Sequence, residues 1–158
     1  MPVTLGNAAA AAAHLAAGDL ALDVGGGRGD HAAVWAQRGI VSVVADPSPG
    51  MVAMAGGLPG VHAVLARAQS LPFRSHCFGL VYFHLSIHYG AVEPSLAEAA
   101  RVMSAGGRIE IWTLGPRHHA SSNLARWFPR VAEIDAERFP HPERIVAGLH
   151  ALGLHAVV

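Results

Sequence analysis

A glycine-rich loop that follows a short apolar run carries the clearest chemical signal in the sequence. The apolar run covers residues 20–24, and the loop reads Gly-Gly-Gly-Arg-Gly over residues 25–29. Glycine lets a backbone approach a ligand closely and turn tightly into a helix whose N–H groups face that ligand. A second apolar run ends at Asp46, where a carboxylate can accept hydrogen bonds from both hydroxyls of a ribose. Together these features predict a site for a nucleotide-like ligand; the alternative is a tight turn followed by an aspartate that caps the next helix.

The loop alone leaves two classes of ligand open. Residues 27–32, Gly-Arg-Gly-Asp-His-Ala, fit the GxGxxA fingerprint of nicotinamide and flavin sites. Asp23 stands two positions before the first glycine, where its negative charge would lie near the pyrophosphate of a dinucleotide. A ligand with a cationic amine and a sulfonium group matches this carboxylate better. We therefore expect the second class and keep an NAD- or flavin-binding oxidoreductase domain as an alternative.

Two histidines at the end of the fourth apolar run, residues 80–84, are the candidate catalytic groups. His88 is the first choice and His84 the second, because imidazole can take up a proton near neutral pH. The alternative is that both rings only shape the pocket by hydrogen bonding to the backbone. His118 and His119 form another pair, but no cysteine or carboxylate stands at ligand spacing beside either pair, so no metal site is expected.

Short apolar runs alternate with helical stretches along the chain, and these elements must position the candidate residues. Strand-like runs cover residues 20–24, 41–45, 61–65, 80–84, 108–113 and 154–158; helical patterns cover residues 8–17, 30–38, 49–55 and 142–152, with one more from residue 93 to the glycine pair 106–107. The runs lack the strict alternation of a strand with one wet face, so both faces of the sheet should be covered. Five parallel strands joined by helices predict a three-layer α/β sandwich that binds ligands beyond the carboxyl ends of its strands.

The composition fits one ordinary domain over residues 1–158. Hydrophobic residues make up 52% of the chain, too many for a disordered protein, and eleven basic residues balance eleven acidic ones, so no overall charge gathers nucleic acid or an anionic membrane. No apolar run approaches the ~20 residues of a membrane helix. Residues 1–4 lack the positive charge of a secretory signal, and the lone Cys77 excludes an internal disulfide. We expect a cytoplasmic protein, and the exclusive use of arginine among basic residues indicates a bacterial genome rich in GC.

Four segments in order resemble the class I S-adenosylmethionine-dependent methyltransferases, of the group called methyltransferase type 11. Residues 23–29 are similar to the first motif of this family and residues 45–51 to its second. Residues 68–73 are similar to the loop beside the adenine, and residues 96–111 to the helix, turn and strand that close the core. The resemblance implies a Rossmann-like, mostly parallel sheet and S-adenosylmethionine as cofactor.

The resemblance also implies a reaction, methyl transfer to a small-molecule acceptor that the motifs do not identify. Transfer from a sulfonium is an in-line displacement, so the protein mainly has to hold the acceptor in line and, for an acidic acceptor, remove a proton. No nucleophilic triad or metal is required. A domain or subunit that binds S-adenosylmethionine without catalysis is the alternative.

With Asp23, the resemblance implies a cofactor site of eight residues: Asp23, Gly25, Gly27, Gly29, Asp46, Met51, Ala68 and Gln69. The glycines would wrap the methionine part, and Asp46 would hold the ribose. Met51 would pack on the adenine, and Ala68 would offer its backbone to the adenine edge, with Gln69 beside it. Arg67 stands where many members carry an acidic residue, and an arginine cannot accept a hydrogen bond from the adenine amino group.

The carboxyl-terminal end is shorter than in this family, whose members usually finish with a sixth strand and an antiparallel seventh. Residues 154–158 supply one strand after the last helix. We expect it to pair in parallel with the strand 108–113 and cover its open edge, unless the chain is a piece of a longer protein. Residues 114–140 are expected to be irregular and anchored in the core by three aromatic side chains: Trp127, Phe128 and Phe139.

Overall fold

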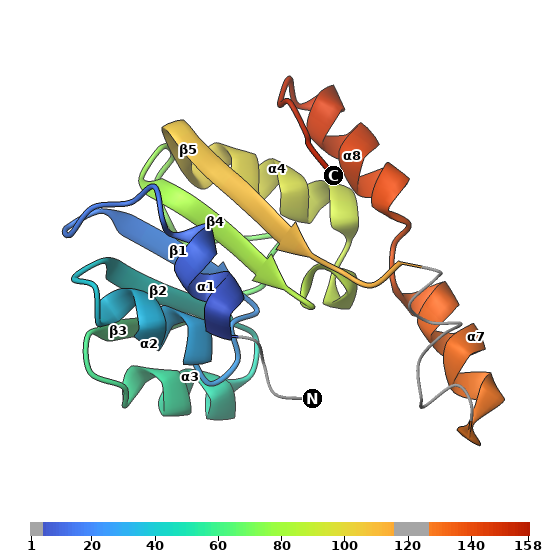
Figure 1. Ribbon diagram of the computed structural model, residues 1–158, viewed down its shortest axis with the longest axis horizontal. Coiled ribbons are helices and arrows are strands. Elements are labelled where there is room, and N and C mark those ends of the chain that lie inside the picture. The colour runs from blue at the N-terminus through green and yellow to red at the C-terminus, as the bar shows by residue number, and fades with distance from the viewer. Residues whose placement is uncertain (1–4, 116–126) are drawn as a thin grey trace.

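A computed structural model of the chain describes residues 5–115 and 127–158. Its strands are β1 (Leu20–Val24), β2 (Val41–Asp46), β3 (Val61–Leu65), β4 (Phe78–His84) and β5 (Met103–Trp112). They form one parallel sheet in the order β3-β2-β1-β4-β5 (Figure 1). The chain runs outward from β1 to β3 and returns on the other side of β1 with β4. The strand order therefore reverses at β1, and ligands bind beyond the carboxyl ends of the strands at such a point.

Helices cover both faces of this sheet. They are α1 (Leu5–Ala11), α2 (Asp30–Ala36), α3 (Pro49–Gly56), the 3₁₀ turn η1 (Ile87–Tyr89), α4 (Val92–Val102), α7 (Pro129–Arg138) and α8 (Pro142–Ala151). Buried residues of α1, α2 and α3 pack on one face, those of α4 and α8 pack on the other, and α7 extends away from the sheet (Figure 1). The predicted three-layer α/β sandwich is confirmed. In the described part of the chain, no helix is both long and apolar enough to cross a membrane.

The central strand β1 shows why the apolar runs lack alternation. Ala21 packs with the layer of α1 and α2, whereas Leu22 and Val24 pack with the layer of α4. Successive side chains of a strand point to opposite faces, and both faces of this strand meet helices, so both require apolar residues. Asp23 is the exception: it lies on the same side as Ala21 by this alternation and is fully buried.

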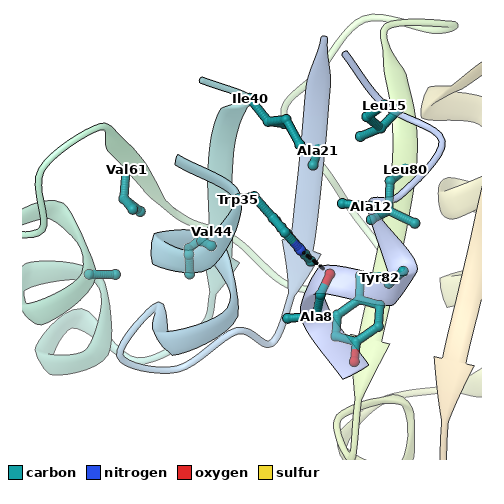
Figure 2. Packing of buried hydrophobic residues seen from close by; sticks show 13 residues of the cluster. Ala8, Ala12, Leu15, Ala21, Trp35, Ile40, Val44, Val61, Leu80 and Tyr82 are labelled. Atoms are coloured by element: carbon teal, nitrogen blue, oxygen red, sulfur yellow. Dashed lines mark hydrogen bonds between the residues drawn. The ribbon is translucent and has the colours of Figure 1, made fainter. Parts of the chain in front are cut away.

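Trp35 of α2 fastens α1 to the sheet. Its indole Nε1 donates a hydrogen bond to the carbonyl oxygen of Ala8 at 2.7 Å (Figure 2). Ala8 is fully buried beside this ring, and its small side chain lets α1 and α2 lie close together, while Ala12 is fully buried in the same cluster. The helix covers residues 5–11 instead of the predicted 8–17, because the chain then turns and places Leu15 in the same core.

The fifth strand begins earlier than predicted. Helix α4 ends at Val102, and β5 starts at the next residue, Met103, so the pair Gly106-Gly107 lies inside the strand and does not end the helix. The register with β4 shifts there: Phe78 pairs with Met103 but Leu80 with Arg108. The chain of β5 is thus longer than that of β4 between these two pairs, and a Cβ on Gly107 would lie 3.0 Å from the Phe78 carbonyl oxygen. The sequence pattern marked the glycines correctly as a break but assigned it to the wrong element.

The predicted last strand is absent, and this correction concerns residues 154–158. They pair with no strand, and β5 is the edge of the described sheet. The backbone N–H of Leu154 donates to the carbonyl oxygen of Leu149 in α8 at 3.0 Å, and Gly153 has a φ of 75°. Gly153 and Leu154 therefore close the carboxyl-terminal end of α8 and do not lead into a strand. Instead of pairing, residues 154–158 line a cavity of about 410 Å³ between α8 and β5.

A partly buried ion pair on α4 holds the loop after β3 in place. Arg101 donates to the carbonyl oxygens of Phe73 at 2.8 Å and Leu71 at 3.0 Å, and to both carboxylate oxygens of Glu98. Glu98 in turn accepts the backbone N–H of Leu71 at 2.8 Å. These bonds attach the part of the loop that follows Ala68 to helix α4.

We expect Arg101→Ala to lower the free energy of unfolding by about 1 to 3 kcal/mol, because it leaves two carbonyl oxygens and the Glu98 carboxylate without their partner. Denaturant titration measures the loss. Arg74→Ala, at an exposed position of the same loop, is the matched control and should change stability little. Equal stability of the two variants would show that the Arg101 bonds do not hold the loop.

Candidate active site

The glycine loop and the end of β2 are joined by two hydrogen bonds that backbone N–H groups of the loop donate. The N–H of Gly25 donates to the carbonyl oxygen of Ala45 at 2.7 Å, and the N–H of Gly27 donates to Oδ2 of Asp46 at 3.0 Å. The other carboxylate oxygen of Asp46 accepts the N–H of Ser48 at 2.9 Å. An ionised carboxylate has about four lone-pair sites, so two remain for a ligand. Asp46 is therefore held rigidly and still able to accept hydrogen bonds.

Two glycines of the loop are needed for different reasons. A Cβ on Gly25 would lie 2.6 Å from the Cβ of Ser86, so this residue lets the loop pass close to the end of β4. Gly27 has a φ of 56°, and a Cβ there would meet nothing within 4 Å. Its missing side chain therefore opens space above the loop instead of admitting a protein neighbour.

Two adjacent cavities lie along the carboxyl ends of the strands. The Asp46 cavity, about 390 Å³, is lined by Asp46, Ala68 and Gln69 among others. The Asp23 cavity, about 350 Å³, is lined by Asp23 and His84 among others. Three residues line both cavities: Gly25, Gly27 and Met51. The two cavities are therefore neighbours on either side of the glycine loop.

The sequence-predicted cofactor residues come together here with one exception. Seven of the eight line one or both cavities: Asp23, Gly25, Gly27, Asp46, Met51, Ala68 and Gln69. Gly29 lines neither. A Cβ on Gly29 would lie 3.2 Å from Ala55 of α3 and 3.1 Å from Leu58, so this residue lets α2 begin close to α3.

Residues 22–111, more than half of the chain, match the methyltransferase domain family. The chain belongs to this family. It is similar to the biotin biosynthesis bifunctional protein BioHC of Cellvibrio japonicus (strain Ueda107), with 37% identity over 98 residues, which are 60% of this chain and 20% of that protein. The sequence-based identification as a class I S-adenosylmethionine-dependent methyltransferase is confirmed, and S-adenosylmethionine is the cofactor of this family.

Solved structures show the same fold. A protein of Anabaena variabilis ATCC 29413, assigned as a methyltransferase of an antibiotic biosynthesis pathway, has a TM-score of 0.82 and 25% identity, with 93% of this chain and 60% of that chain covered. The geranyl diphosphate C-methyltransferase of Streptomyces coelicolor A3(2) has a TM-score of 0.70 and 18% identity, with 92% and 58% covered. The chain thus spans about 60% of the first of these proteins. These comparisons do not favour the NAD- or flavin-binding alternative.

The methyltransferase domain buries an ionisable residue beneath its glycine loop. Asp23 is fully buried, and neither of its carboxylate oxygens has a hydrogen-bond partner among the described residues. Burial raises the pKa of Asp23, and His31, whose Nδ1 lies 3.7 Å from Oδ2, opposes this rise. A buried anion without a partner suits a cationic group of a ligand, so the residues present fit the ammonium of the family's cofactor.

Sequence reasoning missed His31, which lines the Asp23 cavity together with His84. The two imidazole rings lie 4.5 Å apart between centroids. Burial and the neighbouring His31 lower the pKa of His84. The available signal was position: His31 is the second residue of α2, directly after the glycine loop, where a helix begins beside the ligand.

The first-choice catalytic residue, His88, lines neither cavity. Its ring packs against Phe139 at 3.9 Å and Tyr89 at 4.2 Å, and neither ring nitrogen has a hydrogen-bond partner in the described chain. Burial lowers the pKa of His88 to about 4, with the nearby Arg138 guanidinium as a second cause. His88 is thus a neutral ring at pH 7 that joins η1 to the end of α7.

The remaining predictions for the stretch 114–140 concern its secondary structure, its aromatic side chains and a pair of histidines. The structure places a helix, α7, in the stretch predicted to be irregular. Trp127 and Phe128 are exposed and do not anchor it in the core, whereas Phe139 packs on His88. Half of the ten residues of α7 are charged, so the helix itself offers these aromatic rings little apolar surface. The pair of histidines at 118 and 119 lies outside the described residues.

We expect the folded protein to lose stability as the pH falls from 6.5 towards 4, in part through His88. Its pKa is about 4 in the folded state against 6.5 ordinarily, so in this range the unfolded chain binds a proton that the folded chain does not. His88→Phe keeps a ring against Phe139 and should remove this part of the pH dependence. Thermal melts across this pH range measure the change in stability. The control is His62→Phe, at an exposed position of β3. The same pH dependence in the parent and in His88→Phe would contradict the assignment.

Proposed function

We propose that the chain binds S-adenosylmethionine across the Asp46 cavity and the Asp23 cavity and transfers its methyl group to a small-molecule acceptor. The observation that carries the proposal is the junction of the two cavities at Gly27, where no atom of the described residues fills the space of a side chain. A ligand with a ribose on one side and a cationic amino acid on the other can pass over this residue. The absence of a Cβ is what permits that path.

The Asp46 cavity is proposed to hold the adenosine. Asp46 presents its two unused lone pairs to the ribose hydroxyls, and its carboxylate is already oriented by Gly27 and Ser48. Met51 and the backbone of Ala68 supply an apolar wall and a polar edge for the adenine. Arg67, which lines the same cavity, cannot accept the adenine amino group, so we assign that hydrogen bond to Gln69 or to the backbone.

The Asp23 cavity is proposed to hold the methionine part. The unpartnered carboxylate of Asp23 is the counter-charge for the ammonium group, and Gly25 and Gly27 contribute backbone around it. Gly29 supports this arrangement indirectly, by letting α2 start close to α3. Its proposed role is therefore to shape the loop without touching the cofactor.

The methyl-transfer step needs position more than covalent help. When bound, S-adenosylmethionine supplies a methyl group already activated by its sulfonium. His84 is the side chain best placed to act on an acceptor, because it lines the Asp23 cavity and because its lowered pKa keeps the ring neutral at pH 7 and able to accept a proton. We place the catalytic base, where the acceptor needs one, at His84, and assign His88 to the packing of η1.

We further propose that the domain spans residues 1–158 and acts in the cytoplasm of a bacterium. The balance of eleven acidic and eleven basic residues supports a small acceptor over nucleic acid, which would need a basic surface. The solved relatives are longer than this chain, so their acceptors are not carried over to it.

Asp46→Ala should weaken the binding of S-adenosylmethionine by about 1 to 3 kcal/mol, because hydrogen bonds to a charged acceptor are lost. Isothermal titration calorimetry measures the affinity. The matched control is Asp19→Ala. Asp19 directly precedes β1, at the end of the sheet away from the cavities, and its carboxylate accepts a backbone N–H at 2.8 Å. Unchanged affinity in Asp46→Ala would refute the ribose assignment.

Gly27→Val should abolish cofactor binding, because its side chain fills the junction of the cavities. The control is Gly106→Val: this glycine also has a positive φ, 75°, and a Cβ added to it would meet no atom within 4 Å, but it lies at the far end of the sheet. Both variants carry the same kind of backbone strain, so any difference in affinity comes from the site. Normal binding by Gly27→Val would move the cofactor elsewhere.

A further inference from the structure

A group of four titratable side chains lies below the glycine loop. This group, called here the histidine cluster, consists of Asp23, His31, Tyr82 and His84. The first three are buried, and His84 is half-buried. They come from β1, α2 and β4, so only the folded sheet brings them together. Among the described residues no three such side chains are arranged to hold a metal ion, so protons are the ions that this cluster can exchange.

The polar atoms of the histidine cluster are largely without partners. Both carboxylate oxygens of Asp23, Nε2 of His31 and the hydroxyl of Tyr82 make no hydrogen bond within the described chain. The His31 ring lies 4.5 Å from the His84 ring and 5.4 Å from the Tyr82 ring. At 3.7 Å, the approach of His31 Nδ1 to Asp23 is longer than a hydrogen bond. The four side chains therefore interact electrostatically and not through hydrogen bonds.

The loop above the cluster fixes this spacing. A Cβ on Gly26 would lie 2.5 Å from Cγ of Asp23, so the loop backbone rests directly on the carboxylate. Asp23, His31 and His84 all line the Asp23 cavity, where the methionine part of the cofactor is proposed to lie. A change of charge in the cluster is thus felt inside the binding site, at short range and with little water between.

Other charged groups near the cluster are few and partly paired. Arg28 and Asp30 line the same cavity and form their own ion pair at 2.9 Å. From β2, the Asp46 carboxylate acts on Asp23, and from β5, Glu110 acts on Tyr82. Trp112 of β5 is the remaining ring against His84, at 6.5 Å, and it does not titrate. His84 is the half-buried member of the cluster, and its ring takes up a proton in acid.

We propose that His84 makes the preference of this site for S-adenosylmethionine over S-adenosylhomocysteine depend on pH. The inference rests on the proposed function. The Asp23 carboxylate attracts a cation in the Asp23 cavity, which His84 also lines. A proton on His84 sets a positive charge in the same cavity and opposes this attraction. The two ligands differ in charge only by the sulfonium, so this proton opposes the methyl donor more than the demethylated product.

The direction of the pH effect follows from these charges. Burial and His31 lower the pKa of His84, so the ring is neutral at pH 7 and takes up a proton only in acid. Burial raises the pKa of Asp23, so acid also removes the negative charge. Both changes weaken the attraction for a sulfonium as the pH falls. At neutral pH the cluster thus favours the donor, which helps to displace the product.

The test measures binding and needs no acceptor. Calorimetric titrations with S-adenosylmethionine and S-adenosylhomocysteine are run at about pH 5.5 and about pH 7.5, which bracket the ordinary pKa of histidine. We expect the ratio of the two affinities to favour the donor by about tenfold more at the higher pH. Repeating the acid titrations in buffers of different ionisation enthalpy counts released protons, and the donor should release more than the product.

His84→Gln should reduce both the change in the affinity ratio and the proton release, while His62→Gln, at an exposed position of β3, should change neither. Each variant is first checked for a normal melting transition. An affinity ratio that is independent of pH in the parent, or a pH effect of the same size in the parent and in His84→Gln, would overturn the inference while leaving the proposed function intact. Failure of both ligands to bind the parent would overturn the proposed function itself.

Discussion

The hydrogen bond from the Gly27 N–H to the carboxylate of Asp46 joins the two halves of the site. The Gly25 N–H also joins the loop to the end of β2, at Ala45, but only the Gly27 bond reaches the carboxylate. The Asp46 carboxylate is thus oriented by the same backbone that leaves the space above Gly27 open. The Asp46 cavity and the Asp23 cavity meet at this point, so the orientation of the carboxylate at their junction depends on a contact between residues nineteen positions apart.

The sheet that holds this contact rigid also buries the carboxyl group of Asp23. The inner strands are covered by helices on both faces, and nearly every position in them is apolar. Asp23 occupies one of these positions and makes no hydrogen bond to a described residue, and His31 Nδ1 lies 3.7 Å from it. A buried carboxylate without a hydrogen bond destabilises the fold, and its position near the end of a central strand creates an attraction for a cation. The placement of this residue is therefore better explained by binding than by stability.

The parts of the structure that were predictable are those whose signal is local. The runs 20–24 and 61–65 are strands with the predicted bounds, because an uninterrupted apolar run between turn residues has few alternatives. Seven of the eight expected cofactor residues line the cavities, because loops after parallel strands must meet at one edge. The tail at 154–158 was not predictable, since the bond from Leu154 back to α8 competes with strand pairing and no pattern in the sequence reports that competition.

Side-chain partners that are distant along the chain were also beyond the sequence. Spacing brought His84 and His88 to notice together, since both stand at or just beyond the end of β4. Only the fold separates them: His84 ends the strand and turns into the Asp23 cavity, whereas His88 sits in η1 and meets Phe139. A residue type and a position relative to a strand define a candidate, but the direction of the side chain decides its chemistry.

The 3₁₀ turn that holds His88 also links the cavity to helix α7. Tyr89 lines the Asp46 cavity, and the guanidinium of Arg138 lies 4.6 Å above its ring. Phe139, at the end of the same helix, packs on His88 from the other side. A charged ring at position 88 would repel Arg138 and require water in a buried space, so the low pKa of His88 and the docking of α7 are two aspects of one packing arrangement. The wall of the Asp46 cavity is thereby fixed from outside the sheet by His88 and Phe139, two rings that line neither cavity.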